Sequence, residues 1–172
     1  ERRELEIIGA RPWYHSSDAR MNATLISHES GRHRVRYLVG VRLRGSTTRA
    51  LPVKSRRVHF RSDDPWMDRN AIQLNALNPH VQEIGEALFR MAGLPALRAR
   101  AVRVLENNSD MAGEGQYGHF VQVDTLDSDY IRWQFPNDPS GNLYKGGGHA
   151  KLEYLGDDPL PYGEKHFYDR QT

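Results

Sequence analysis

The side chains best suited to chemistry in this sequence are basic groups in its first third. Ten lysines and arginines, and no carboxylate, lie between Arg32 and Arg61. Guanidinium and ammonium groups are the side chains that bind phosphate. The segment can therefore hold an anion, or it forms the solvated face of a sheet, which is the commoner origin of such a run.

Lys54 is the most specific candidate within this run. Segment 53–60 alternates as a strand does, and the alternation puts Lys54 and Arg56 on the same face as Val58 and Phe60. Lys54 then points inward if that face is covered, and a lysine facing a cleft can pair with nucleotide phosphates when a helix glutamate holds it. The alternative is an ordinary surface lysine, because lysine is rarely buried without a partner.

Other catalytic chemistries lack their signatures. The chain has no cysteine, no GxSxG motif and no HExxH motif. Three glycines follow Lys145 and can turn backbone amides toward an anion, but they match neither the P-loop nor the dinucleotide spacing. No two histidines pair at helical spacing, so we expect no transition-metal site among His15, His28, His33, His59, His80, His119, His149 and His166.

Length and composition favour one domain or a piece of one. The chain has 172 residues, 38% hydrophobic and 27% charged, and no apolar run reaches the length that a membrane span needs. A net charge of +2 is weak support for nucleic-acid binding, and the aromatic residues Tyr37 and Phe60 alternate with core positions. We therefore expect neither nucleic acid nor a membrane span as a partner.

The elements that must position these groups form an α+β pattern. An antiparallel sheet with one main packed helix, resembling the small lobe of a protein kinase, is the expected fold. Asp127 is expected to cap a short second helix, and the chain beyond Phe135 is expected to be irregular. Strand signals lie at 23–27, 33–45, 53–60, 99–105 and 117–124, with turns at 28–32 and 107–115.

The main helix is predicted from Pro79 to Ala92. Asn78 is expected to cap its first turn, and Pro79 suits the first helical position because its missing donor has no intrahelical acceptor there. Gly93 supplies the stop. An apolar stripe at helical spacing is expected to pack on the apolar side of the sheet; it consists of Val81, Ile84, Leu88 and Met91.

Several segments, in order from about residue 20 to 148, resemble the spore-coat CotH kinase family. RLRGSTTR at 42–49, followed by Pro52 and Lys54, is similar to the family's RGxSSR segment with its proline and lysine. Further segments similar to those of the family are LNA at 74–76, EALFRMAGLP at 86–95, RAR at 98–100, the stretch from Gly118 to Ile131, and GNLYKG at 141–146.

The resemblance implies an atypical protein kinase that transfers the γ-phosphate of ATP to Ser or Thr of coat or secreted proteins, with Mg²⁺ or Mn²⁺. The resemblance favours an extracytoplasmic, secreted or coat-associated location, which the residues themselves leave open. Lys54 corresponds to the nucleotide-pairing lysine, with Glu83 or Glu86 as its helix partner. Further nucleotide or phosphate contacts are expected from Arg44, Asp124 and Lys145.

The sequence also departs from the family. Asp124 stands where the family usually has glutamate, and no segment up to Thr172 resembles the family's metal-binding carboxylates. We therefore expect the nucleotide-side half of a kinase, a single partial domain that is inactive without the remaining half. The alternative is a non-catalytic structural or adhesive module of a surface protein with a kinase-like shape.

Overall fold

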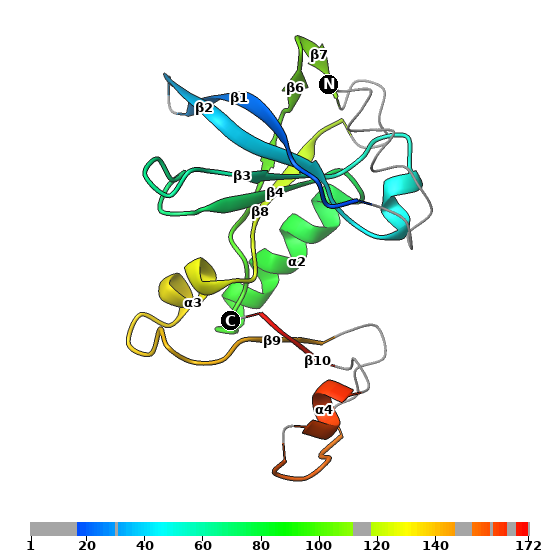
Figure 1. Cartoon of the computed structure of the whole chain (residues 1–172), viewed down its shortest axis with the longest axis vertical. Coiled ribbons are helices and arrows are strands. Elements are labelled where there is room, and N and C mark those ends of the chain that lie inside the picture. The colour runs from blue at the N-terminus through cyan, green and yellow to red at the C-terminus, as the bar shows by residue number, and fades with distance from the viewer. Residues whose placement is uncertain are drawn as a thin grey trace. The chain divides into compact units, whose positions relative to one another are not determined.

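The computed structural model describes residues 17–29, 31–111, 118–146, 153–158, 160–164 and 168–171 (Figure 1). The chain divides into two compact units, Glu1–Thr125 and Leu126–Thr172. The first unit contains the large sheet and the long helix, and the second contains short elements. Within the described residues, no helix is both long and apolar enough to cross a bilayer.

The first unit is built on a six-stranded sheet in the order β1-β2-β3-β4-β8-β5. Each neighbouring pair in this order runs antiparallel, which confirms the expected α+β class with an antiparallel sheet. Its strands are β1 (Met21–Glu29), β2 (Arg32–Leu43), β3 (Arg56–His59), β4 (Ala71–Asn75), β5 (Ala99–Val102) and β8 (Phe120–Asp124). A short 3₁₀ helix, η2 (Thr47–Ala50), and the hairpin of β6 (Leu105–Glu106) and β7 (Ser109–Asp110) complete this unit with helix α2 (Pro79–Met91).

The turn and second strand of the β6–β7 hairpin occupy the first part of the predicted 107–115 loop. Its two turn residues, Asn107 and Asn108, have φ of 52° and 66°, as a type I′ turn requires. Leu105, which was expected to end the preceding strand, lies in β6 instead. Tyr117, the predicted first residue of the last strand, lies outside the described residues, and β8 begins at Phe120.

The strand register separates the sheet into two faces. One face, here called the core face, carries Val58, Ile72, Leu74 and Phe120, which belong to the buried cluster. The opposite face, here called the basic face, carries Arg42 opposite Arg57. Since successive strand residues alternate between faces, Arg44 and Asn75 also belong to the basic face.

Helix α2 has the predicted start, but Asn78 does not cap it as expected. Asn78 adopts a left-handed backbone with φ of 46°, and its side chain makes no capping hydrogen bond. Its main-chain carbonyl accepts from the amides of Val81 and Gln82 instead, at 3.1 and 3.2 Å. The predicted boundary is otherwise confirmed to within one residue, because α2 ends at Met91 and not at Ala92.

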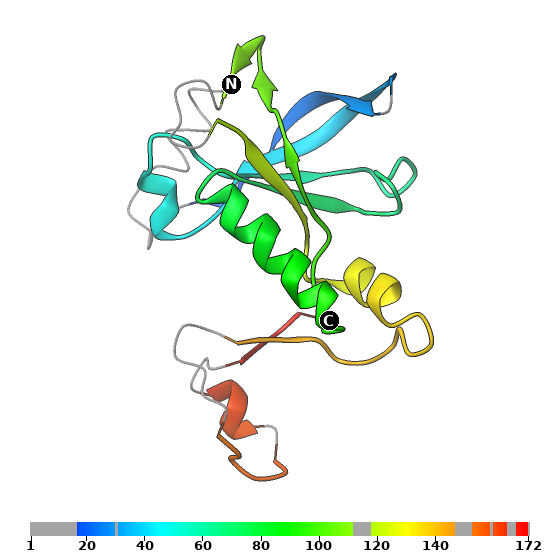
Figure 2. The same cartoon turned by 180° about the vertical axis from the view of Figure 1, so that it is seen from behind.

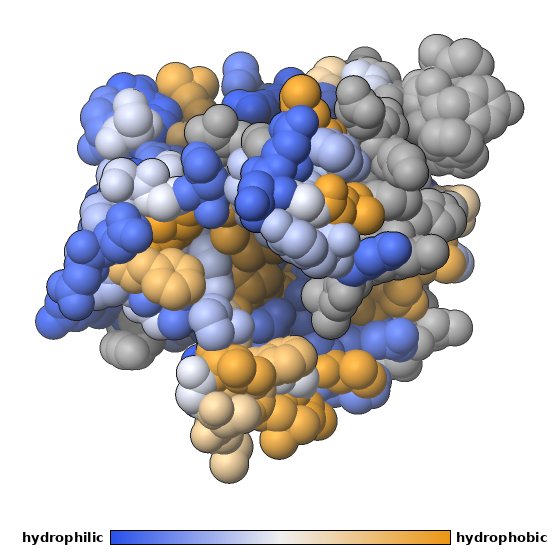
Figure 3. All heavy atoms as spheres, turned by 90° about the horizontal axis from the view of Figure 1, so that it is seen from below, coloured by the Kyte–Doolittle hydropathy of each residue, from blue (hydrophilic) through white to orange (hydrophobic). Residues whose placement is uncertain are grey.

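The face of α2 that was expected to be buried is exposed. Val81, Ile84 and Leu88 are each 59% exposed and Met91 is 83% exposed, so the predicted packing of this stripe on the sheet is wrong. Figure 3 shows hydrophobic side chains gathered at the lower edge of that view. We call these four residues, together with the exposed Phe89, the α2 apolar stripe.

Polar contacts explain the orientation of α2, which passes β8 and β5 (Figure 2). The Glu83 carboxylate accepts the main-chain amide of Ala101 on the edge strand β5, at 3.0 Å. The Glu86 carboxylate accepts the amide of Leu97, at 2.7 Å. Backbone amides near a sheet edge need hydrogen-bond acceptors. The two carboxylates are such acceptors, so the side of α2 that carries them faces the sheet.

The second unit contains α3 (Ser128–Gln134), α4 (Leu160–Glu164), and the paired strands β9 (Tyr144–Gly146) and β10 (Tyr168–Arg170). Asp127 caps α3 as predicted, because its carboxylate accepts the amides of Asp129 and Tyr130 at 3.0 and 3.4 Å. Beyond Phe135, where irregular chain was expected, the described residues thus include one helix and one strand pair.

Candidate phosphate-binding site

The candidate site begins where β2 ends, at Arg44. The amide of Arg44 donates to the carbonyl of Ser55 at 3.1 Å, which places the end of β2 beside the segment that leads into β3. Ser55 in turn accepts the amide of Ala76 through its hydroxyl, at 3.0 Å. These two hydrogen bonds join the end of β2, the segment before β3 and the residue after β4.

The Arg44 guanidinium is held by a chain of neutral side chains. It donates to the side-chain oxygen of Asn75, at the end of β4. The Asn75 amide nitrogen donates to the side-chain oxygen of Gln82 in the first turns of α2, at 2.6 Å. Arg44 is thereby linked to helix α2 through Asn75.

The electrostatics of Arg44 are unfavourable without a further partner. Its pKa is lowered to about 10, mainly by burial and in addition by the positive charges of Arg57 and Arg42. Within the part of the chain that the structure describes, no carboxylate forms an ion pair with Arg44. The guanidinium remains charged at neutral pH, so an anion bound beside it removes an existing electrostatic cost.

The surrounding basic face reinforces this field. Arg42 pairs with Asp18 at 2.7 Å, and Arg49 contacts the same carboxylate. His59 on this face has its pKa lowered to about 4, first by burial and then by nearby arginines. Because burial is the larger cause of that shift, the pKa of His59 is only partly due to the positive charges beside it.

Lys54 lies near this site, but not as the sequence predicted. The lysine precedes β3, which begins at Arg56, so its expected place on the strand is wrong. Its ammonium group is partly buried and donates to the carbonyl of Leu51 at 3.2 Å. Glu83 and Glu86 accept main-chain amides instead of meeting Lys54. Its role with phosphate stays a prediction.

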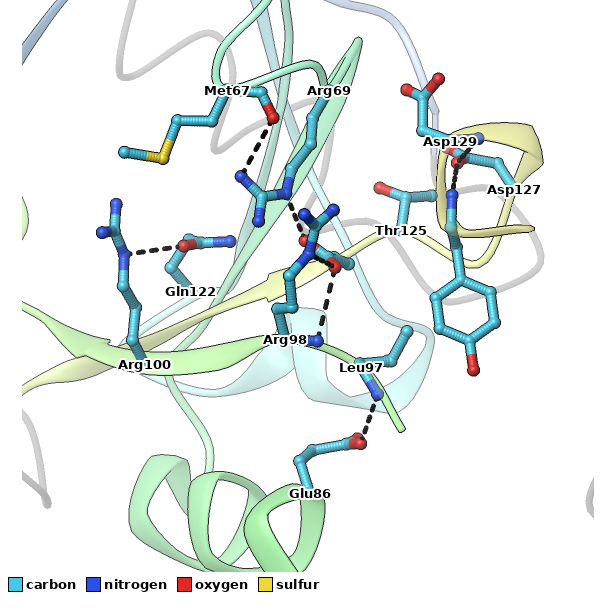
Figure 4. A network of polar contacts seen from close by, with 12 residues as sticks. Met67, Arg69, Glu86, Leu97, Arg98, Arg100, Gln122, Thr125, Asp127 and Asp129 are labelled. Carbon is cyan, nitrogen blue, oxygen red and sulfur yellow. Dashed lines mark hydrogen bonds and ion pairs between the residues drawn. The ribbon is translucent and has the colours of Figure 1, made fainter. Parts of the chain in front are cut away.

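Asp124 is enclosed between two arginines. Its carboxylate receives the Arg69 and Arg98 guanidinium groups, each at 2.5 Å, and the residue is 2% exposed (Figure 4). Arg98 and Arg69 come from segments that flank β8 on its two sides, so the carboxylate ties three segments together. Any contact of Asp124 with a nucleotide requires one of these pairs to open.

Lys145, the remaining predicted phosphate contact, lies on β9 in the second unit and is exposed. It stands opposite Asp169 in the register with β10. Its participation in a site with Arg44 stays a prediction, because the two residues belong to separate compact units.

Sequence reasoning missed the neutral partners of Arg44. Asn75 was quoted only as part of a family-like segment, and Gln82 carried no assignment. The alternation of β2 and β4 was the available signal, since it assigns Arg44 and Asn75 to the same face once the strands are paired. No protein-family description matches this chain, and no curated protein matches it. The geometry of the site therefore carries the functional argument.

Proposed function

We propose that this chain is the nucleotide-side half of an atypical protein kinase of the CotH type. The parent protein transfers the γ-phosphate of ATP to Ser or Thr of coat or secreted proteins. The observation that carries the proposal is Arg44, a partly buried guanidinium with like-charged neighbours, a neutral amide as its side-chain partner, and no carboxylate beside it among the described residues. A phosphate group supplies the missing negative charge.

In this proposal Arg44 binds phosphate oxygens while Asn75 and Gln82 keep it oriented. The guanidinium has five donors, and one of them goes to Asn75, so others remain for a bidentate contact with phosphate. Lys54 donates to a neutral carbonyl, which a phosphate oxygen can replace at little cost. The residues of this chain thus bind and position the nucleotide.

Divalent metal supplies charge neutralisation in phosphoryl transfer when it is bound. Among the described residues there is no cluster of three or more histidine, aspartate or glutamate side chains that fits such an ion. The proposal accordingly places the metal ligands in the remaining half of the kinase, which is the partner that this chain requires for activity.

Binding tests the nucleotide site directly on this chain. Pyrophosphate and ATP should raise the melting temperature more than chloride does at equal ionic strength. The increase should disappear in Arg44→Ala and persist in Arg61→Ala, an exposed arginine that pairs with Asp63. An unchanged increase in Arg44→Ala would reject this site.

Activity is tested on the full-length protein with radiolabelled ATP and divalent metal. Lys54→Met keeps the apolar stem and removes the charge, so it should abolish transfer while circular dichroism remains unchanged. Lys54→Arg should also fail, because a planar guanidinium does not replace a compact ammonium group. Full activity in Lys54→Met rejects the proposed role of this lysine.

A non-catalytic module is the second candidate, and the α2 apolar stripe favours it. Exposed apolar patches mark protein contacts, and a binding module needs such a surface whether or not it handles phosphate. A full-length protein that binds nucleotide but transfers no phosphate to any Ser or Thr acceptor supports this candidate over the kinase.

A further inference from the structure

The β1–β2 hairpin carries two histidines that face each other across its strands. His28 and His33 are direct partners in the antiparallel register (Figure 1 shows the hairpin). Direct partners on the same face of an antiparallel pair bring their side chains within contact distance. Both side chains are exposed, so the pair is accessible to small solutes.

The two imidazole rings are in close contact. The Nδ1 atom of His28 lies 3.2 Å from Nδ1 and 3.1 Å from Nε2 of His33, and the ring centroids are 4.2 Å apart. Because His28 Nδ1 is almost equidistant from the two ring nitrogens of His33, it lies over the face of that ring. The two side chains are therefore close enough to share an ion once the rings turn toward it.

The separation suits a metal chelate. With metal–nitrogen bonds of about 2.0–2.1 Å, two cis ligands lie about 2.9 Å apart at a right angle and about 3.4 Å apart in a tetrahedron. The observed 3.1 and 3.2 Å lie between these values. The rings are exposed and their χ2 angles are soft, so they can turn until one lone pair of each ring points at the same ion.

We infer that His28 and His33 form a two-histidine binding site for a divalent transition-metal ion of the Zn²⁺, Ni²⁺ or Cu²⁺ class. Imidazole is the ligand these ions favour, whereas Mg²⁺ and Mn²⁺ favour oxygen ligands. Water fills the other coordination positions, since no third ligand side chain clusters here among the described residues. The inference replaces the sequence-based expectation of no transition-metal site and is independent of the proposed kinase function.

The neighbouring charges set the character of the site. Arg32 and Arg34 flank His33 and are exposed, and Arg34 pairs with Asp64. Glu29 follows His28 and stands opposite Arg32 in the register, so charges of both signs lie nearby and the site is selective by ligand type and not by strong local charge.

Calorimetric titration of the 172-residue chain near neutral pH tests the inference. ZnCl₂ and NiCl₂ should each bind with a stoichiometry of one, and MgCl₂ should produce no binding heat. His28→Ala and His33→Ala should each lose the zinc and nickel binding. His80→Ala, which removes another exposed histidine on α2, should retain it.

The two single variants change exposed side chains and should fold as the parent does, which circular dichroism verifies. Saturation with ZnCl₂ should also raise the melting temperature of the parent and of His80→Ala only, because a ligand that joins two strands favours the folded state. Zinc binding that is unchanged in both His28→Ala and His33→Ala, or that is absent up to about 1 mM in the parent, overturns the inference.

Discussion

The guanidinium of Arg44 donates to the side-chain oxygen of Asn75, so a partly buried cation has a neutral amide where a carboxylate would satisfy it better. The same amide continues to Gln82 on α2. This relationship leaves the positive charge of Arg44 available to a ligand. It also makes Asn75 the position at which a new carboxylate would neutralise Arg44 in place of a phosphate.

Asn75→Asp should weaken phosphate binding at Arg44. The new carboxylate lies beside Arg44 and supplies the charge that a phosphate would supply, so the stabilisation by pyrophosphate should shrink. The unliganded protein should melt at an unchanged or higher temperature. Asn70→Asp is the control. It changes an exposed residue just before the other end of β4 and should leave the stabilisation by pyrophosphate intact. Undiminished stabilisation in Asn75→Asp contradicts the role given to Arg44.

Leu88 should contribute little to the stability of this chain. Because it is 59% exposed, Leu88→Ala should change the free energy of unfolding by less than about 0.5 kcal/mol. Leu74→Ala, at a 9% exposed core position, should cost about 2–5 kcal/mol. Urea unfolding of both variants makes the comparison. A large loss at Leu88 would show that this side of α2 is packed after all.

Asp124→Asn should destabilise the first unit strongly. The substitution leaves two guanidinium groups, of Arg69 and Arg98, around a neutral residue that is 2% exposed in the parent. Breaking a buried ion pair on one side costs about 3–5 kcal/mol. Asp63→Asn breaks the exposed pair with Arg61 and is expected to cause no measurable change. Equal effects of the two substitutions in denaturant melts would count against a structural role for Asp124.

His59 should make the fold sensitive to mild acid. Its pKa is about 4 in the folded chain, against an ordinary value near 6.5, so the unfolded state binds more protons between these values. The free energy of unfolding should therefore fall as pH drops from about 6.5 to 4, since stability follows the proton difference. His59→Gln removes this contribution and should flatten the dependence in that window. Parallel pH curves for the parent and the variant would show that His59 is not responsible.

The sequence predicted five of the six strands of the large sheet, but neither β4 nor the packing of α2. The alternation in β2 and β3 is a property of neighbouring residues, so it identifies strands without knowledge of their partners. The spacing of the α2 apolar stripe also identifies a helix correctly, but it does not determine which face of that helix packs on the sheet. The amides of Leu97 and Ala101 decide that, and their need for the Glu86 and Glu83 carboxylates arises only when the chain is folded.

The candidate site was likewise only partly predictable from the sequence. Arg44 stands out in the sequence because no acid occurs near it, and the family resemblance selects it. The link from Arg44 through Asn75 to Gln82 joins three segments, so no local pattern encodes it. His28 and His33 are also separated by a turn, and only the hairpin register makes them neighbours.

The α2 apolar stripe has a calorimetric consequence. Side chains that stay hydrated in the folded state undergo little change in hydration on unfolding, and the heat-capacity increment arises from newly hydrated apolar surface. The increment of this chain should therefore fall below the usual value of about 12–15 cal/mol/K per residue, which gives a flatter stability curve with temperature. A partner that covers the α2 apolar stripe would raise the heat-capacity increment of unfolding and make the dependence of stability on temperature steeper.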